Sequence, residues 1–364
     1  MAAVRRFRSG GRRVLILSYH RVVEDFTGAL QTSIPGLLIS RETFRRQLEE
    51  LAASGYEFAS MADTLDVIAG RRRAKKDLCL ITFDDGYRDV YRHGFPILRS
   101  LGIPAVMYVP SGYIGTQRRF QHDRLFHLFL TLQTRRFQPI LEALPAASAA
   151  LVDAVAHGRL RPAEAVDTFL AQHSGGLAQR LIDALSEQLG GGSDVVPQDG
   201  EPMTWDEVRE LAANGFEIGA HTVSHTVLPM EEPERAEWEI VESKATIERE
   251  LGRPCRDFAY CNGWYSDELI RMLIHAGFRS AVTTEDLPNR IGGDPFTLKR
   301  KVLWENFSAG FDGGYSSCVT GCQLDDVFTS LGGGTVVIGR KPQRGSPNVA
   351  IPFTEPESTL PGGI

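Results

Sequence analysis

The stretch "CLITFDDGYRDVY", residues 79–91, joins an apolar run to two adjacent carboxylates. Residues 78–83 have the composition of a buried strand, and Asp84, Asp85 and Gly86 follow directly. Neighbouring carboxylates repel each other, so each must be solvated or neutralised by a partner. Gly86 allows the chain to turn sharply after them. An isolated Asp-Asp-Gly is more often a simple turn, but its position here predicts a strand that ends at a charged site.

Strand-like and helix-like segments alternate along the chain, which indicates an α/β fold. Besides 78–83, the expected strands include residues 13–20, 104–110, 216–221 and 257–264. Three strands end in ionisable residues: His20, the Asp84–Asp85 pair and His221. In parallel α/β folds the carboxyl ends of the strands meet on one face, where functional sites are built. We therefore expect these side chains to share one site.

Three segments depart from this alternation. Residues 117–200 have the pattern of Ala- and Leu-rich helices, and we interpret them as a helical insertion near the mouth of the fold. Residues 1–13 are expected to form a basic tail, and residues 341–364, which are dense in Gly and Pro, a flexible tail. The catalytic domain is then expected over residues 14–340.

Charge and composition narrow the range of partners. The net charge of −6 argues against nucleic acid, because a phosphate-binding face needs clustered basic residues. We interpret the basic run at residues 4–13 as a solvated tail, with peripheral contact to an acidic membrane surface as the alternative. We find no stretch as long as a signal-peptide core or a membrane span, and the five cysteines lack a framework spacing. We therefore expect a cytoplasmic protein with free thiols. The sequence does not determine its oligomeric state.

The segment "HTVSH" places His221 and His225 four residues apart. If the segment turns helically, both imidazoles lie on one face and can bind a single ion. One carboxylate of the Asp84–Asp85 pair would complete a three-ligand set with an open position, and the other would remain as a base. Each pattern alone is weak, and His20 alone could be a core histidine. Their joint occurrence at strand ends favours a metal site.

These motifs resemble those of the polysaccharide deacetylases, carbohydrate esterase family 4. "TFDDG" at 82–86 and "HTVSH" at 221–225 are similar to the first two motifs of that family, and the likeness runs from about Val14 to Val302. The early "SYHRV" at 18–22 is similar to the subgroup with a permuted motif order, typified by the poly-N-acetylglucosamine deacetylases. The resemblance implies a distorted (β/α) barrel of about seven strands with a helical insertion.

The resemblance also implies roles for individual residues. Asp84 would be the general base, and the metal ligands would be Asp85, His221 and His225. Most of the family takes its catalytic acid from a late Leu-x-His, which the late "TVVIGRK" lacks, so the role falls to His20. We expect His20 near the metal, on the side opposite Asp84, with Tyr19 facing away from the site or at its rim.

The third motif departs from the pattern. "FAYCNGWY" at 258–265 has Cys261 where the subgroup usually has proline, so the loop is expected to be looser. Tyr260, through its backbone N–H, and Asn262 are the expected substrate and oxyanion residues. Arg300 is a weak candidate for orienting the base, and we favour the alternative of a solvated surface charge.

The predicted activity is that of a metal-dependent hydrolase that removes an N-acetyl group from an amino sugar in a saccharide or glycolipid intermediate. Zn²⁺ is the expected metal, and Co²⁺, Ni²⁺ and Fe²⁺ also suit nitrogen and oxygen ligands. One alternative is an amidase that acts on a non-sugar or cyclic amide. The other is a non-catalytic sugar-binding relative that has lost its oxyanion site.

Overall fold

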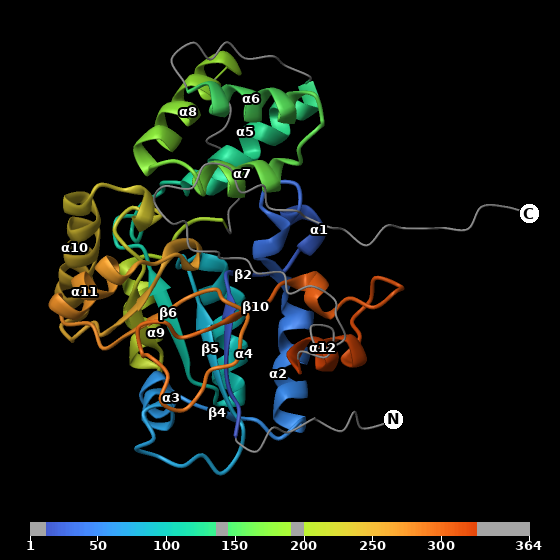
Figure 1. Cartoon of the computed structure of the whole chain (residues 1–364). Coiled ribbons are helices and arrows are strands. Elements are labelled where there is room, and N and C mark those ends of the chain that lie inside the picture. Colours follow the sequence, from blue (N-terminus) through green and yellow to red (C-terminus); the bar gives the residue numbers. More distant parts are fainter. Residues whose placement is uncertain (1–11, 136–144, 191–199, 326–364) are drawn as a thin grey trace, which may run out of the picture.

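The structure, a computed structural model, describes residues 12–135, 145–190 and 200–325. Its centre is a parallel sheet in the order β10-β1-β5-β6-β7-β8-β9, with the short β4 also paired to β5. The seven strands curl into a half-barrel surrounded by helices (Figure 1). The strands are β1 (Val14–Tyr19), β4 (Glu57–Phe58), β5 (Leu78–Phe83), β6 (Ala105–Val109), β7 (Glu217–Ala220), β8 (Asp257–Ala259), β9 (Ser280–Val282) and β10 (Lys301–Val302). The distorted barrel expected from the sequence is confirmed.

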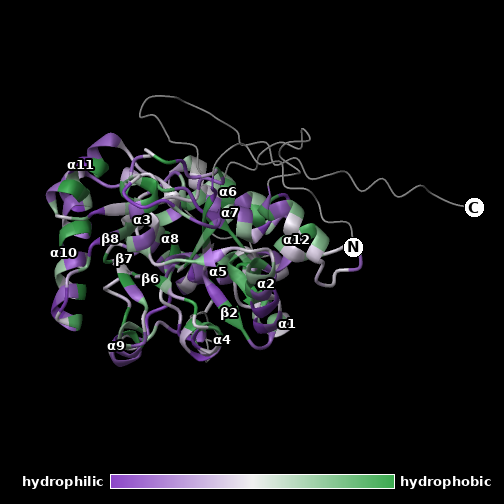
Figure 2. Ribbon diagram, turned by 90° about the horizontal axis from the view of Figure 1, so that it is seen from below, coloured by the Kyte–Doolittle hydropathy of each residue, from purple (hydrophilic) through white to green (hydrophobic). Residues whose placement is uncertain are grey.

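Helices follow most strands, as the alternating pattern predicts. They are α1 (Phe26–Ala29), α2 (Arg41–Ala53), α3 (Met61–Ile68), α4 (Phe95–Leu101), α5 (Gln121–Arg135), α6 (Ala146–Ala156), α7 (Pro162–Leu170), α8 (Gly175–Gln188), α9 (Trp205–Ala213), α10 (Pro233–Leu251), α11 (Asp267–His275) and α12 (Ser317–Leu324). Two further short strands, β2 (Arg21–Val23) and β3 (Leu38–Ser40), pair with each other. Short 3₁₀ segments cover Pro35–Leu37, Leu228–Met230, Cys261–Gly263 and Glu305–Ser308, and a π-helical segment covers Val90–Gly94. The surrounding helices carry both hydrophobic and hydrophilic residues (Figure 2).

Strand parity divides the core into two layers. Leu17 and Phe83 belong to the cluster that packs under the outer helices, whereas Ile16 and Leu80 belong to a second cluster that includes residues of α3. Because successive side chains of a strand point to opposite faces, the even-numbered residues of β1 and β5 share the face of Ile16 and Leu80. That face is the inside of the curled sheet, so side chains that continue this parity past the strand ends lie at its mouth.

The helices α5–α8 build a core of their own. Leu125, Phe129, Val166, Phe169 and Leu181 pack together in a cluster separate from those of the sheet. The helices lie beyond the end of β6 (Figure 1). This group falls within residues 117–200, of which 136–144 and 191–199 are outside the described residues. The two tails expected at 1–13 and 341–364 fall outside them too, except for residues 12 and 13. Among the described residues, no helix is both long and apolar enough to cross a bilayer.

Candidate metal-centred active site

The ends of β1 and β5 bring His20 and Asp84 side by side. The strands are parallel with Ser18 opposite Thr82 and Tyr19 opposite Phe83, so the next pair in register is His20 and Asp84. His20 Nε2 lies 4.0 Å from Asp84 Oδ2. The expectation that His20 stands on the side opposite Asp84 is wrong, because strand register fixes the two as neighbours. Tyr19 has the other parity and is buried, with its hydroxyl donating to Gln47 Oε1 at 2.8 Å.

Asp85, His221 and His225 converge on one point. Asp85 Oδ1 lies 3.5 Å from His221 Nε2 and 3.0 Å from His225 Nε2. His221 Nδ1 lies 2.8 Å from the Ala259 carbonyl oxygen and must donate to it, which leaves the Nε2 lone pair of a neutral imidazole free. Asp85 Oδ1 is buried and has no hydrogen-bond partner within the described chain. An orphaned carboxylate oxygen beside a free imidazole lone pair fits a divalent cation.

The "HTVSH" segment reaches this geometry without a helix. Residues 221–227 form a loop in which Thr222 (φ 65°) and His225 (φ 55°) adopt the left-handed conformation, as Asp85 (φ 70°) does on the facing turn. Non-glycine residues rarely adopt it, and such strain is concentrated at functional sites. The condition of a helical turn is therefore not met, although the two imidazoles still meet, with ring centroids 4.9 Å apart.

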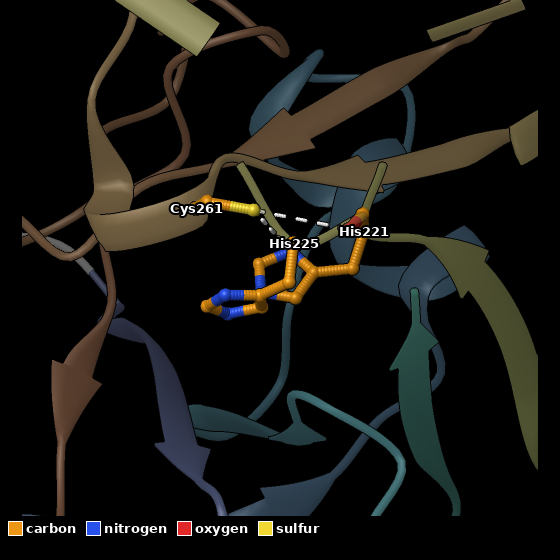
Figure 3. Close-up of side chains that lie close together, drawn as sticks. All are labelled: His221, His225 and Cys261. Atoms are coloured by element: carbon orange, nitrogen blue, oxygen red, sulfur yellow. Dashed lines mark hydrogen bonds between the residues drawn. The ribbon is translucent and has the colours of Figure 1, made fainter. Parts of the chain in front are cut away.

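Cys261 offers a competing third ligand. Ligand atoms of His221, His225 and Cys261 all lie within 4.8 Å of one another (Figure 3). However, Cys261 Sγ lies 3.8 Å from His221 Nδ1, the nitrogen already engaged by Ala259. The thiol therefore stands at the wrong edge of the His221 ring to share an ion bound at Nε2. The set of Asp85, His221 and His225 fits a metal better.

Arg300 is fully buried behind Asp84. Its guanidinium forms a two-pronged ion pair with Asp84, at 2.8 Å to Oδ1 and 2.7 Å to Oδ2, and its Nε donates to the Thr283 carbonyl at 2.8 Å. Burial alone would raise the pKa of the Asp84 carboxyl, but Arg300 outweighs it and holds the pKa below its ordinary value. The surface-charge reading that the sequence favoured for Arg300 is wrong. It was misleading because the flanking Lys299 and Lys301 form ion pairs of their own, with Glu285 and Asp286.

The third motif does not provide the expected oxyanion donor at Tyr260. The Tyr260 backbone N–H donates to the Val282 carbonyl at 3.2 Å in the sheet, and its hydroxyl donates to the Phe296 carbonyl. That assignment is wrong, because the donor is already used in holding β8 against β9. Asn262, at φ 56°, turns the chain next to Cys261, and its carbonyl accepts from the Thr284 hydroxyl at 3.0 Å.

Three buried residues beside the site were not singled out from the sequence. Tyr87 follows the aspartate turn, and its hydroxyl lies 2.7 Å from both His122 Nε2 and Asp123 Oδ2. The His122 ring lies 5.0 Å from that of His225, between centroids. Burial lowers the pKa of His122 to about 4, so it is neutral near pH 7. The signal was present in "FQHDRLF", where the ionisable residues His122, Asp123 and Arg124 stand between apolar residues at the start of the helix.

Glu239 holds the histidine loop from behind. It is fully buried on α10 and accepts from the backbone N–H groups of Val223 and Ser224 at 2.7 and 2.9 Å, and from the Ser224 hydroxyl at 2.6 Å. The loop between His221 and His225 is thereby fixed by one carboxylate. Without these bonds, the left-handed residues of the loop would lose what compensates their strain.

We expect Glu239→Gln to weaken metal binding by about 10- to 100-fold, the usual cost of losing a partner behind the ligands. Glu239 Oε1 accepts from the Ser224 hydroxyl and from Arg235. In glutamine an NH₂ group takes the place of this oxygen and faces those two donors. Metal affinity is measured by competition with a chelator. Glu237→Gln, at an exposed position of the same helix, is the matched control. Equal metal affinity in both variants would contradict the positioning role.

The chain is similar to several known proteins. YxkH of Bacillus subtilis, named as a polysaccharide deacetylase, is 18% identical over 270 residues, covering 74% of this chain and 64% of YxkH. The poly-β-1,6-N-acetyl-D-glucosamine N-deacetylase of Staphylococcus epidermidis is 28% identical over 109 residues, covering 28% of this chain and 37% of that protein. This chain thus spans less than two thirds of the length of either curated relative.

Solved structures of deacetylases share the fold. The Streptococcus pyogenes deacetylase PplD matches with a TM-score of 0.55 at 16% identity, over 86% of this chain and 99% of that one. IcaB from Ammonifex degensii matches with a TM-score of 0.55 at 20% identity, over 86% of this chain and 98% of its own. The family model "Polysaccharide deacetylase" matches residues 71–281, which is more than half of the 364 residues. The chain therefore belongs to the polysaccharide deacetylase family.

Proposed function

We propose that the protein is a metal-dependent N-deacetylase that hydrolyses the acetamido group of an amino sugar in a saccharide or glycolipid. One observation carries the proposal. The orphaned Asp85 oxygen and the Nε2 atoms of His221 and His225 meet beside a second carboxylate, Asp84, which Arg300 holds in place. A metal site with an adjacent fixed base suits hydrolysis better than binding alone.

Asp85, His221 and His225 would hold the divalent metal, for which Zn²⁺ is the first expectation and Co²⁺, Ni²⁺ or Fe²⁺ are alternatives. When bound, the ion supplies a Lewis acid that polarises the acetyl carbonyl. Deprotonated Asp85 is consistent with this role. Burial would raise the pKa of its carboxyl, but His225 and His221 outweigh burial and lower it.

Asp84 would accept the proton of the attacking water. Its two oxygens are fixed by Arg300, and its lowered pKa keeps it ionised near neutral pH. The ion pair weakens Asp84 as a base but removes the cost of orienting it during the reaction. The backbone N–H of Asn262 would donate to the developing oxyanion, the role that the sequence assigned to Tyr260.

His20 would protonate the departing amine. Burial lowers the pKa of its imidazole, and the Asp85 and Asp84 carboxylates only partly offset this. Its Nδ1 is buried without a partner in the described chain, and its Nε2 lies 4.0 Å from Asp84 Oδ2. The proton that Asp84 takes from the attacking water would reach His20 through one bridging water and pass from there to the amine. The acid is therefore placed next to the base and not across the site.

We expect His20→Ala to slow hydrolysis of an N-acetyl sugar by about 10² to 10⁴, because an amine must be protonated to leave. An activated aryl ester should be much less affected, since its phenolate leaves unaided. The comparison uses kcat for both substrates with the same metal-loaded protein. Equal losses on the two substrates would assign His20 a structural role.

The proposal is tested by acetate release from N-acetylglucosamine oligomers, with metal content measured on protein purified without added metal. Activity that is lost with a chelator and restored by Zn²⁺ supports it. Release only from simple or cyclic amides would favour the amidase alternative. Saccharide binding without acetate release would favour a non-catalytic relative.

A further inference from the structure

The helical group α5–α8 contributes its first residues to the wall of the site. His122 and Asp123 lie in the first turn of α5, and their side chains are 93% and 95% buried beside Tyr87. Tyr87 itself directly follows the Asp84–Asp85–Gly86 turn. One hydrogen-bonded cluster thus connects the turn that carries the carboxylates to the helices that lie beyond the end of β6.

The hydrogen bonds of this cluster determine the tautomer of His122. The Tyr87 hydroxyl has a single proton, which it donates to Asp123 Oδ2 at 2.7 Å. The bond of 2.7 Å between Tyr87 and His122 therefore needs its proton on His122 Nε2. In a neutral imidazole the other nitrogen is then an acceptor. No partner for His122 Nδ1 occurs within the described chain.

The His122 ring is also fixed in position. It stacks on Phe120 with centroids 5.2 Å apart and an interplanar angle of 8°, and its other neighbour is the His225 ring at 5.0 Å. A ring held on three sides, with one free acceptor nitrogen, is preorganised for a ligand that donates a hydrogen bond.

We propose that His122 is a substrate-recognition residue, whose Nδ1 accepts a hydrogen bond from a hydroxyl group of the sugar next to the scissile acetamide. The inference rests on the proposed function and deepens it. A sugar hydroxyl can donate, whereas the acetyl group cannot, so this contact selects for the saccharide part of the substrate. The contact comes from the helical group and not from the half-barrel.

The test uses binding of a glucosamine tetramer, the deacetylated product, to the metal-loaded full chain by calorimetry, because a product is not turned over. His122→Phe keeps the ring stack but has no acceptor, and should weaken binding about 3- to 10-fold, the value of one neutral hydrogen bond. His122→Asn carries an amide oxygen close to the position of Nδ1 and should recover part of the loss. His157→Phe, at an exposed histidine of the same helical group, is the matched control.

Binding of acetate, which has no hydroxyl to offer, should be the same in His122→Phe as in the wild type, as should metal content. Undiminished tetramer binding by His122→Phe overturns this inference alone. Equal weakening of acetate and tetramer also overturns it, because it indicates a general distortion. A wild type that neither binds the tetramer nor releases acetate overturns both this inference and the proposed function.

Discussion

His225→Ala should strip the metal from the protein and abolish acetate release while the fold survives. His225 is one of only two nitrogen ligands in the proposed set, and its Nε2 lies 3.0 Å from Asp85 Oδ1. Its loop is held separately by Glu239, so the surroundings should persist. Elemental analysis, acetate release and circular dichroism measure the three effects. His221→Ala should behave alike, although it also removes the bond to the Ala259 carbonyl.

Cys261→Ala separates the two ligand sets and serves as the control. If Asp85 is the third ligand, removal of the thiol leaves metal content and turnover close to wild type, because Sγ stands at the Nδ1 edge of His221. Loss of metal in Cys261→Ala with full retention in Asp85→Asn would assign the thiol as the ligand instead. Full metal occupancy and activity in His225→Ala would refute both sets.

Asp84→Asn should retain the metal and lower kcat by about 10²- to 10⁴-fold, because the amide cannot accept a proton from water. Asp85→Asn should instead weaken metal binding. The measurements are kcat and metal occupancy of each variant after loading with Zn²⁺. If the two phenotypes are exchanged, the roles of the two aspartates are exchanged as well.

Asp84→Asn carries a second consequence, for stability. The change leaves the fully buried Arg300 guanidinium without its counter-charge, which commonly costs about 3–5 kcal/mol. The lowered pKa of Asp84 also sets a pH dependence for the wild type. The ion pair contributes fully above the ordinary carboxyl pKa of 3.8, and its contribution is lost as pH falls through the lowered value. Melting temperatures of wild type and variant should therefore converge on acidification.

The sequence predicts the site best where a strand ends. His20, Asp84 and His221 follow apolar runs, and the carboxyl ends of parallel strands meet on one face, so their assembly could be anticipated. The left-handed conformation of Thr222 and His225 could not be anticipated, because the spacing of two histidines is the same in a helical turn and in a loop. The neighbouring positions of His20 and Asp84 depend on strand register, which apolar runs that are buried on both faces leave unspecified.

Partners that lie far apart in the sequence could not be predicted for a different reason. Arg300 lies 216 residues from Asp84 and between two lysines that form ion pairs of their own, so local charge predicted the wrong environment. Glu239 occupies a long amphipathic helix rich in exposed glutamates, and nothing local distinguishes it from them. Tyr260 was assigned a free N–H because its motif resembled that of the family, whereas its pairing with Val282 depends on the neighbouring strand.

The two ends of the curled sheet, β10 and β9, come close together. Leu298, just before β10, bridges to Val282 at the end of β9, while β1 lies between β10 and β5. Because the sheet is nearly closed, the strand position beside β5 can be filled by a strand from either terminus of a chain. In this protein the N-terminal strand fills it and brings His20 beside Asp84. Motif order read along a linear alignment would miss His20, whereas superposition of the strands finds it at the position of the proposed acid.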